Sequence, residues 1–204
     1  MKHLSFSFIV TCVIVSVAAS AEAQTQTRRR TTTTVRTRAA SVPDAGMIGI
    51  GASISPTTAT SSDFLGNGVE IAGNVEGYVT PRFSIRGQVG TAWWDIVGLS
   101  YPGTLQPIFF LGNAVYNWEA GDLHPYVTGG GGMYHYAFDE AGVTGSTTKP
   151  GFDLGGGVEY FFLPETTLTG ELLTHRVGNV PTNRATLGFK GSFWSFTVGA
   201  KHYF

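Results

Sequence analysis

The sequence predicts an all-β protein: an eight-stranded antiparallel transmembrane β-barrel preceded by a signal peptide and a disordered arm. Three observations lead to this fold class. Charged residues make up 13% of the chain, against about 25% in an ordinary soluble domain, yet no apolar run after the N-terminal segment is long enough for a membrane-spanning helix. Several segments alternate apolar and polar residues with the period of a β-strand. The connections between these segments alternate between short and long.

The first 23 residues are predicted to be a signal peptide. Lys2 and His3 form a positive start, an apolar stretch follows, and Ala21-Glu22-Ala23 has the small-x-small pattern of a cleavage site after residue 23. The apolar stretch is shorter than the run of about 20 residues that a membrane helix needs. The single cysteine, Cys12, lies inside this segment, so the mature chain is expected to contain no disulfide and no cysteine-based metal site.

Residues 24–45 are predicted to be a disordered periplasmic arm. The segment is rich in threonine and arginine and contains almost no large apolar side chains, so it cannot bury enough surface to offset the entropy of ordering. We interpret it as a solvated linker; the alternative is that Arg28, Arg29 and Arg30 contact anionic cell-wall or lipid head groups. The net charge of −1 gives no reason to expect a nucleic-acid partner.

The barrel itself is assigned to residues 46–204, and its first half contains four strand candidates. Isoleucine and alanine alternate with glycine and serine in the first, and valine and isoleucine alternate with polar residues in the second and third. The facing of the fourth stays open, because Phe109 and Leu111 compete with Ile108 and Phe110 for the apolar face. The predicted strands cover residues 46–54, 69–79, 83–94 and 107–118.

The second half contains four more strand candidates. The fifth is glycine-rich, so its facing is also open, whereas the sixth alternates clearly between large apolar residues and glycine or carboxylates. The seventh places leucine and threonine opposite polar residues. These strands are predicted over residues 124–137, 152–162, 167–177 and 192–204.

The connections give the sequence its membrane signature. Short turns are expected near residues 81, 121 and 164, and longer loops near residues 60, 99, 144 and 184. Membrane barrels of the bacterial outer membrane have short periplasmic turns and long extracellular loops. A soluble β-sandwich has no reason to alternate connection lengths in this way.

The last predicted strand carries the most specific pattern. Phe196, Val198, Ala200 and Phe204 share one face, and the chain ends on an aromatic residue of that face. This pattern resembles the terminal strand of outer-membrane barrels, whose C-terminal aromatic residue is read by the barrel assembly machinery. His202 departs from it, because an apolar residue is commoner at that position.

Residues 46–204 resemble the small outer-membrane β-barrel family that includes the OmpA-like membrane domain and OmpX-like proteins. The matching features are the Gly-x-Gly opening, His124-Pro125-Tyr126 before a glycine-rich strand, the segment from Gly155 to Tyr160, and the final Val-Gly-Ala-Lys-His-Tyr-Phe. The resemblance implies a Gram-negative outer-membrane location and contact with outer-membrane lipid. The sequence has no room for the peptidoglycan-binding domain of longer family members.

If the apolar faces contact lipid, the charged residues opposite them point into the lumen. Counting about Pro81 places Glu76 opposite Arg86, which is a favourable cross-strand pair. Counting about Glu165 places two carboxylates, Glu159 and Glu171, opposite each other, and Lys201 on the adjacent strand is then the candidate cation. The predicted lumen network comprises Glu70, Glu76, Arg86, Asp153, Glu159, Glu171 and Lys201.

An eight-stranded barrel is just wide enough for side chains to fill, so we expect this network to form a static plug. The alternative is a gate in which charged pairs exchange partners. The expected function is therefore that of a structural barrel or a narrow, mostly closed pore. The alternatives are a surface adhesion protein acting through its long loops and a soluble barrel with apolar residues inside.

Aromatic residues gather near the predicted strand ends, and we interpret them as the interfacial girdle of a membrane barrel rather than as a sugar-stacking surface. The set is Trp93, Trp94, Tyr101, Tyr116, Trp118, Tyr134, Tyr136, Tyr160, Phe161 and Phe162.

No catalytic, metal or cofactor site is predicted. The segment from His175 to Asn179 faintly resembles the histidine-serine motif of outer-membrane lipid A deacylases, but Val177 stands where the serine nucleophile would be. No carboxylate follows Glu171 to orient the histidine, so the requirements of a catalytic triad are not met. A lipid-modifying enzyme is therefore the least favoured alternative. The histidines have no metal-ligand spacing.

Overall fold

The structure is a computed structural model that describes residues 43–60, 65–96, 103–118, 121–140, 143–180 and 189–204. The predicted signal peptide and nearly all of the predicted arm, including Arg28, Arg29 and Arg30, lie outside the described residues. No helix within the described ranges is long and apolar enough to span a membrane.

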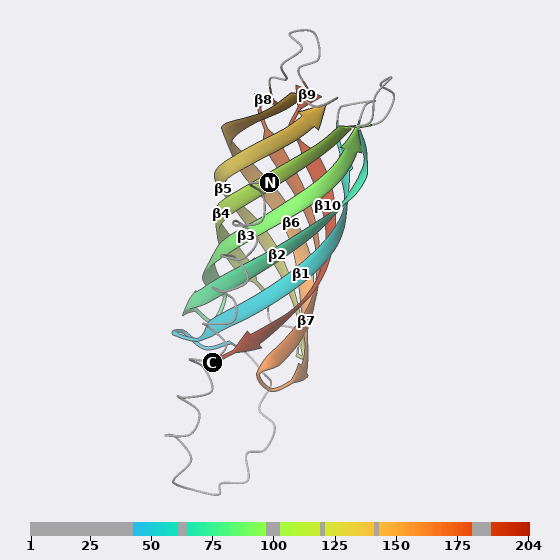
Figure 1. The fold of residues 1–204 in the computed structure, drawn as a ribbon. Helices are drawn as coiled ribbons and strands as arrows, with labels where there is room; N and C mark the ends of the chain where they lie inside the picture. The colour runs from blue at the N-terminus through green and yellow to red at the C-terminus, as the bar shows by residue number, and fades with distance from the viewer. Residues whose placement is uncertain (1–42, 61–64, 97–102, 119–120, 141–142, 181–188) are drawn as a thin grey trace, which may run out of the picture. The chain divides into compact units, whose positions relative to one another are not determined.

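Eight antiparallel strands close into one barrel, in the order β1-β10-β7-β6-β5-β4-β3-β2 (Figure 1). A separate two-stranded sheet pairs β8 with β9. The elements are β1 Ile48–Ala59, β2 Leu65–Thr80, β3 Phe83–Ile96, β4 Gly103–Asn117, β5 Leu123–Glu140, β6 Val143–Leu163, β7 Thr166–Val177, β8 Asn179–Val180, β9 Phe189–Lys190 and β10 Phe193–Tyr203. The predicted eight-stranded antiparallel barrel is confirmed.

The two ends of the barrel differ. We call the end where β2 meets β3 and β6 meets β7 the turn end; it also holds the first residues of β1 and the last residues of β10. Backbone hydrogen bonds tie it together, among them those from Asn117 to the Arg82 carbonyl and from Tyr203 to the Glu165 carbonyl. The opposite end, which carries β8 and β9, is the loop end (Figure 1).

Most strands extend further toward the loop end than the sequence predicts. The largest difference is in β6, which begins at Val143 rather than at residue 152. The stretch from Val143 to Pro150 pairs in continuous register with β5, so the predicted loop over residues 138–150 is wrong in this part. Its serine, threonine and glycine residues have the composition of a loop, but threonine is also a good strand former.

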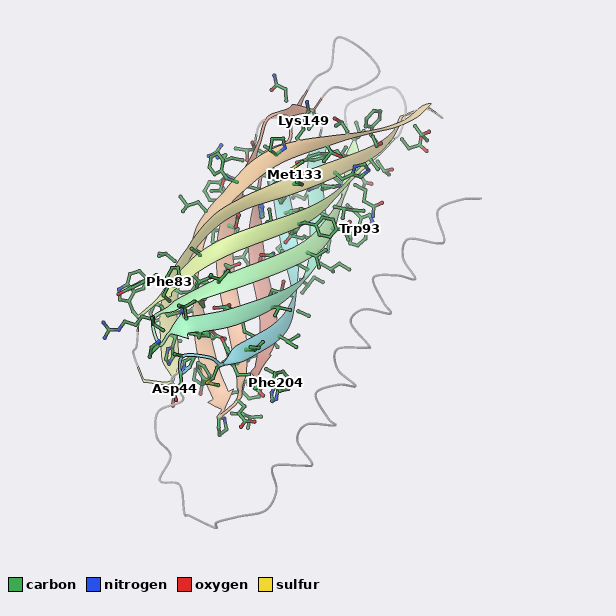
Figure 2. The ribbon with its side chains drawn as sticks, turned by 90° about the vertical axis from the view of Figure 1, so that its left-hand side faces the viewer. Asp44, Phe83, Trp93, Met133, Lys149 and Phe204 are labelled. Carbon is green, nitrogen blue, oxygen red and sulfur yellow. The ribbon has the colours of Figure 1, made fainter. Side chains whose placement is uncertain are left out.

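The outer wall of the barrel is apolar. Side chains such as Phe83, Trp93 and Phe204 project from the wall (Figure 2). Further exposed apolar side chains occur on every barrel strand, including Ile54, Ile71, Val75, Ile85, Phe110, Val127, Phe152, Leu154, Leu168, Leu172, Phe196 and Val198. A wall with this pattern of exposed residues suits a hydrocarbon surrounding rather than water.

The structure also settles the facing of the fourth predicted strand. Phe110 projects outward and Ile108 is partly exposed, whereas Phe109 and Leu111 are buried in the lumen. In β5, the even-numbered side chains from His124 to Thr128 and from Tyr134 to Phe138 face inward. The lumen is therefore lined by large side chains as well as by polar ones.

Candidate functional site in the barrel lumen

An ionic network occupies the half of the lumen nearer the turn end. Arg86, which lies opposite Glu76 in the β2–β3 ladder as predicted, donates from Nε to Glu76 at 2.9 Å and from Nη1 to Glu171 at 2.6 Å. The Nζ atom of Lys201 lies 2.7 Å from Glu76 and 3.4 Å from Glu159. All five side chains are buried. Each cation bridges two carboxylates, and Glu76 is shared by both cations.

Neutral donors complete the network. Tyr126 donates to Glu171 at 2.8 Å, and Tyr203 donates to Glu159 at 2.7 Å. The Arg86 guanidinium also lies over the Tyr126 ring, 5.2 Å from its centroid. The hydroxyls of Ser84 and Thr167 donate to Glu76 and Glu159. Buried charges that are paired and hydrogen-bonded in this way hold their neighbours in one arrangement.

The predicted pairing of Glu159 with Glu171 is wrong. Glu159 pairs with Thr169, two residues away from the expected partner. The turn between β6 and β7 is tight and the ladder beside it is irregular, which shifts the register relative to a count centred on Glu165. The two carboxylates do not face each other, and Lys201 instead links Glu159 to a carboxylate of β2.

Two of the seven predicted network residues lie apart from the other five. The Asp153 carboxylate accepts a hydrogen bond from the Asn113 side-chain amide and makes no ion pair with a described residue. Glu70 is fully buried, and neither of its carboxylate oxygens has a hydrogen-bond partner among the described residues. The structure thus brings five of the charges together and gives the other two carboxylates no cation from the described part of the chain.

A cluster of apolar and aromatic side chains fills the half of the lumen nearer the loop end. Its members are Ala72, Ala92, Trp94, Leu105, Phe109, Leu111, Tyr134, Tyr136, Phe138, Val177, Val180 and Phe193, which we call the loop-end cluster. The rings of Trp94 and Phe193 meet edge to face at 4.9 Å between centroids. A β-carbon at Gly90 would overlap the Phe109 ring, so only glycine leaves room for that ring. The inward positions of this half therefore carry large apolar side chains beside polar ones such as Thr57, His175 and Ser195.

The loop-end cluster corrects the prediction of an aromatic girdle. Trp94, Tyr134 and Tyr136 face the lumen, and so does Phe161 at the other end. Because successive side chains of a strand point to opposite faces, neighbours such as a Trp-Trp pair cannot both join an outer girdle. Tyr101 lies outside the described residues, and the predicted members that do project outward are Trp93, Tyr116, Trp118, Tyr160 and Phe162.

A smaller aromatic cluster lies at the turn end. The Phe161 and Tyr203 rings stack with centroids 5.7 Å apart, and Tyr78 meets Tyr203 edge to face at 5.9 Å. His124 contacts Phe161 edge to face at 5.0 Å. Tyr203 also donates a hydrogen bond to the ionic network, so this cluster and the network form continuous packing. The lumen therefore has three layers: aromatic, ionic and aromatic.

His175 makes a contact that the sequence did not reveal. Its Nε2 atom lies 3.2 Å from the Ser195 hydroxyl and its Nδ1 atom 2.9 Å from the Tyr134 hydroxyl. A hydroxyl beside an imidazole is the pair that nucleophilic catalysis uses. Here the imidazole is 0% exposed and stacks on Phe193 at 4.2 Å between centroids, so a substrate could reach it only if the loop-end cluster opened. The contact links β5, β7 and β10 inside the lumen.

The four residues of the predicted assembly signal lie on one face of the last strand. Phe196, Val198, Ala200 and Phe204 all project outward. The strand that carries them pairs with both β7 and β1. This arrangement leaves the aromatic ring of the last residue exposed at the turn end.

Comparison with solved structures places this architecture among known folds. Neisserial surface protein A matches with a TM-score of 0.63 and 17% identity, over 78% of this chain and 99% of that one. The chain has the fold of small outer-membrane β-barrels. The outer-membrane protein OprG of Pseudomonas aeruginosa matches with a TM-score of 0.54 and 14% identity, over 81% of this chain and 99% of that one. The attachment invasion locus protein Ail of Yersinia pestis, solved with the heparin analogue sucrose octasulfate, matches with a TM-score of 0.51 and 13% identity, over 78% and 99% of the two chains.

These matches agree with the resemblance to OmpA-like and OmpX-like barrels. At this level of identity they establish the fold and leave the activity open. No protein-family model matches the sequence, and no curated protein matches it either.

Proposed function

We propose that this protein is a bacterial outer-membrane β-barrel whose lumen is closed by its own side chains, so that it acts as a structural membrane protein or as a narrow, mostly closed pore. The apolar outer wall supports the location in a membrane. The fold of small outer-membrane barrels supports the choice of membrane. On this proposal the turn end and the N-terminal arm face the periplasm, and the loop end faces outward.

The observation that carries the closed state is the layering of the lumen. The ionic network and the loop-end cluster are built from different residues and block different depths of the barrel. An ion would have to pass both. Rearranging the charged pairs alone would leave the aromatic layer in place, which argues for a closed barrel rather than a gate worked by the ion pairs.

Conductance in a planar lipid bilayer tests this proposal. Mature protein would be refolded, and heat-sensitive gel mobility would verify that it is folded before measurement. We expect a silent bilayer for the wild type and for Glu76→Gln, because the loop-end cluster still fills the lumen. Discrete conductance steps in the wild type that change in Glu76→Gln or Arg86→Gln would overturn the closed lumen and establish a gated pore.

Adhesion through the loop end is the second candidate function. The specific observation is the length of the β5–β6 hairpin, whose strands stay paired as far as Glu140 and Val143. The attachment protein Ail, which shares the fold, was solved with a heparin analogue. Cells displaying the protein would be tested for retention on heparin beads, and shortening the hairpin by removing residues 138–145 should abolish retention. Equal retention after shortening would exclude this hairpin as the adhesive element.

The remaining partners are also proposals. Outer-membrane lipid would contact the apolar wall, and the barrel assembly machinery would read the last strand. The arginines at positions 28–30 would contact anionic cell-wall or lipid head groups if the arm binds anything.

A further inference from the structure

The charges buried in the lumen do not balance. The described residues contribute five buried carboxylates and the buried side chains of one arginine and one lysine; these are Glu70, Glu76, Asp153, Glu159 and Glu171, with Arg86 and Lys201. The ion pairs involve three of the carboxylates. Two carboxylates, Glu70 and Asp153, are therefore left without a positive partner among the described residues.

Of the two, Glu70 is in the less favourable surroundings. Its side chain is 0% solvent-exposed, and both of its carboxylate oxygens are unpartnered among the described residues. Its neighbours across the two ladders are Ser55 and Ala92. The Ser55 hydroxyl is already engaged with Thr197, at 2.7 Å, and Ala92 has no polar side-chain atom. An ionised carboxylate in such surroundings is unfavourable unless a proton or a cation neutralises it.

Asp153 has a similar deficit. It is 1% exposed, and its second carboxylate oxygen has no partner in the described part of the chain. The side-chain carbonyl of Asn113 is also unpartnered. Asn113 and Asp153 flank Gly130 in neighbouring ladders, and glycine contributes no side chain to the space between them.

The register places Glu70 and Asp153 across the lumen from each other. Their strands, β2 and β6, lie four places apart in both directions around the barrel. Following the pairing from Glu70 through β1, β10 and β7 leads to Gly157, and following it through β3, β4 and β5 leads to Thr147. Asp153 lies between these two positions of β6, so the two carboxylates enter the lumen from opposite walls at a similar depth.

Most of the unpartnered buried side-chain atoms of the described residues are acceptors. Among the described residues, side-chain oxygens without a hydrogen-bond partner occur in Glu70, Asn74, Gln88, Asn113 and Asp153. Carboxylate and amide oxygens are the ligands that hard divalent cations prefer. No three acidic or histidine side chains of the described residues come close enough to hold a metal by themselves, so amide oxygens and water would complete the coordination.

We propose that the lumen holds one hydrated divalent cation, Ca²⁺ or Mg²⁺, between Glu70 and Asp153. A single doubly charged ion neutralises the two unpaired carboxylates and supplies the missing partner for their free oxygens. It lies between the ionic network and the loop-end cluster, and packing on both sides makes it an ion acquired during folding. The proposal holds whether or not the barrel conducts.

Metal content is the first test. Mature protein would be refolded with CaCl₂ or MgCl₂, transferred to buffer containing a chelator, and analysed for metal per barrel. We expect close to one retained equivalent in the wild type and in Glu165→Gln, a matched change on an exposed turn, and a loss of at least tenfold in Glu70→Gln. Metal at the same level in Glu70→Gln, or none in the wild type, would overturn the proposal.

Thermal unfolding gives an independent readout if one variant refolds poorly. Refolding with divalent cation should raise the Tm of the wild type by about 5 °C relative to NaCl of equal ionic strength. Asp153→Asn, a second variant at the other wall, should reduce the shift as Glu70→Gln does. An equal rise in Tm with NaCl alone would rule out a divalent ion. A wild-type Tm that does not respond to either salt but is raised by Glu70→Gln would show that Glu70 is uncompensated or protonated.

Discussion

Removing the Arg86 guanidinium should be the most damaging single change in the ionic network. Arg86 holds Glu76 and Glu171 through two different nitrogens, at 2.9 Å and 2.6 Å. After Arg86→Gln, Glu76 keeps Lys201 and a serine hydroxyl, but among the described residues Glu171 keeps only the Tyr126 hydroxyl. Breaking a buried ion pair by removing one partner costs about 3–5 kcal/mol, and we expect a loss of unfolding free energy in that range.

The measurement is urea unfolding of the refolded barrel in lipid vesicles, with Arg176→Gln as the control because Arg176 is exposed on the outer face of β7. If the loss arises from the stranded carboxylate, adding Glu171→Gln to Arg86→Gln should recover part of it, with a coupling energy of about 1–3 kcal/mol. Arg86→Lys should rescue poorly, since one ammonium cannot reproduce the two-nitrogen geometry. An Arg86→Gln barrel as stable as the Arg176→Gln control would refute the reasoning.

Three other predictions concern packing and assembly. Gly132→Ala should lower the unfolding free energy by about 1–3 kcal/mol, because the new β-carbon would overlap the Phe110 carbonyl. Gly112→Ala is the control, since its β-carbon meets only open space. Equal stability of the two variants in urea would contradict the packing. Trp94→Phe should cost about 1 kcal/mol by removing the 2.7 Å hydrogen bond from its indole to a threonine hydroxyl of β1, and an unchanged urea midpoint would show that this bond is not needed. Phe204→Ser should reduce the heat-sensitive folded fraction in membranes of expressing cells while leaving the stability of refolded protein within about 1 kcal/mol; unchanged assembly would remove the residue from the predicted signal.

Strand positions and facing were largely predictable because alternation is a local property of the sequence. The terminal strand, predicted over residues 192–204, is observed from Phe193 to Tyr203. Strand ends near the loops were not predictable from composition. In the β5–β6 hairpin the segment from Val143 to Pro150 is built from small polar residues, and only its pairing with β5 shows that it continues the sheet.

The lumen was harder to predict, because its contacts join residues far apart in the chain. The pairing of Glu76 with Arg86 could be predicted, because the turn between β2 and β3 is short and counting residues outward from it places the two side chains opposite each other. The contact of Lys201 with Glu76 spans most of the barrel sequence and has no local signal. The predicted girdle places Trp94 on the wrong face because it groups this residue with Trp93, although strict alternation sends one of two neighbouring tryptophans inward.

The closure of the barrel sets the order in which the protein can form. Gly49 and Tyr203 face each other across the seam between β1 and β10, so the two strands that complete the ring come from opposite ends of the barrel sequence. Both keep an unpaired edge until the whole chain has been delivered, and such edges invite pairing with other chains. Contacts of this sequence separation also form slowly. Because the seam closes last, the topology itself requires that the unfolded chain be protected from pairing with other chains until it reaches its membrane.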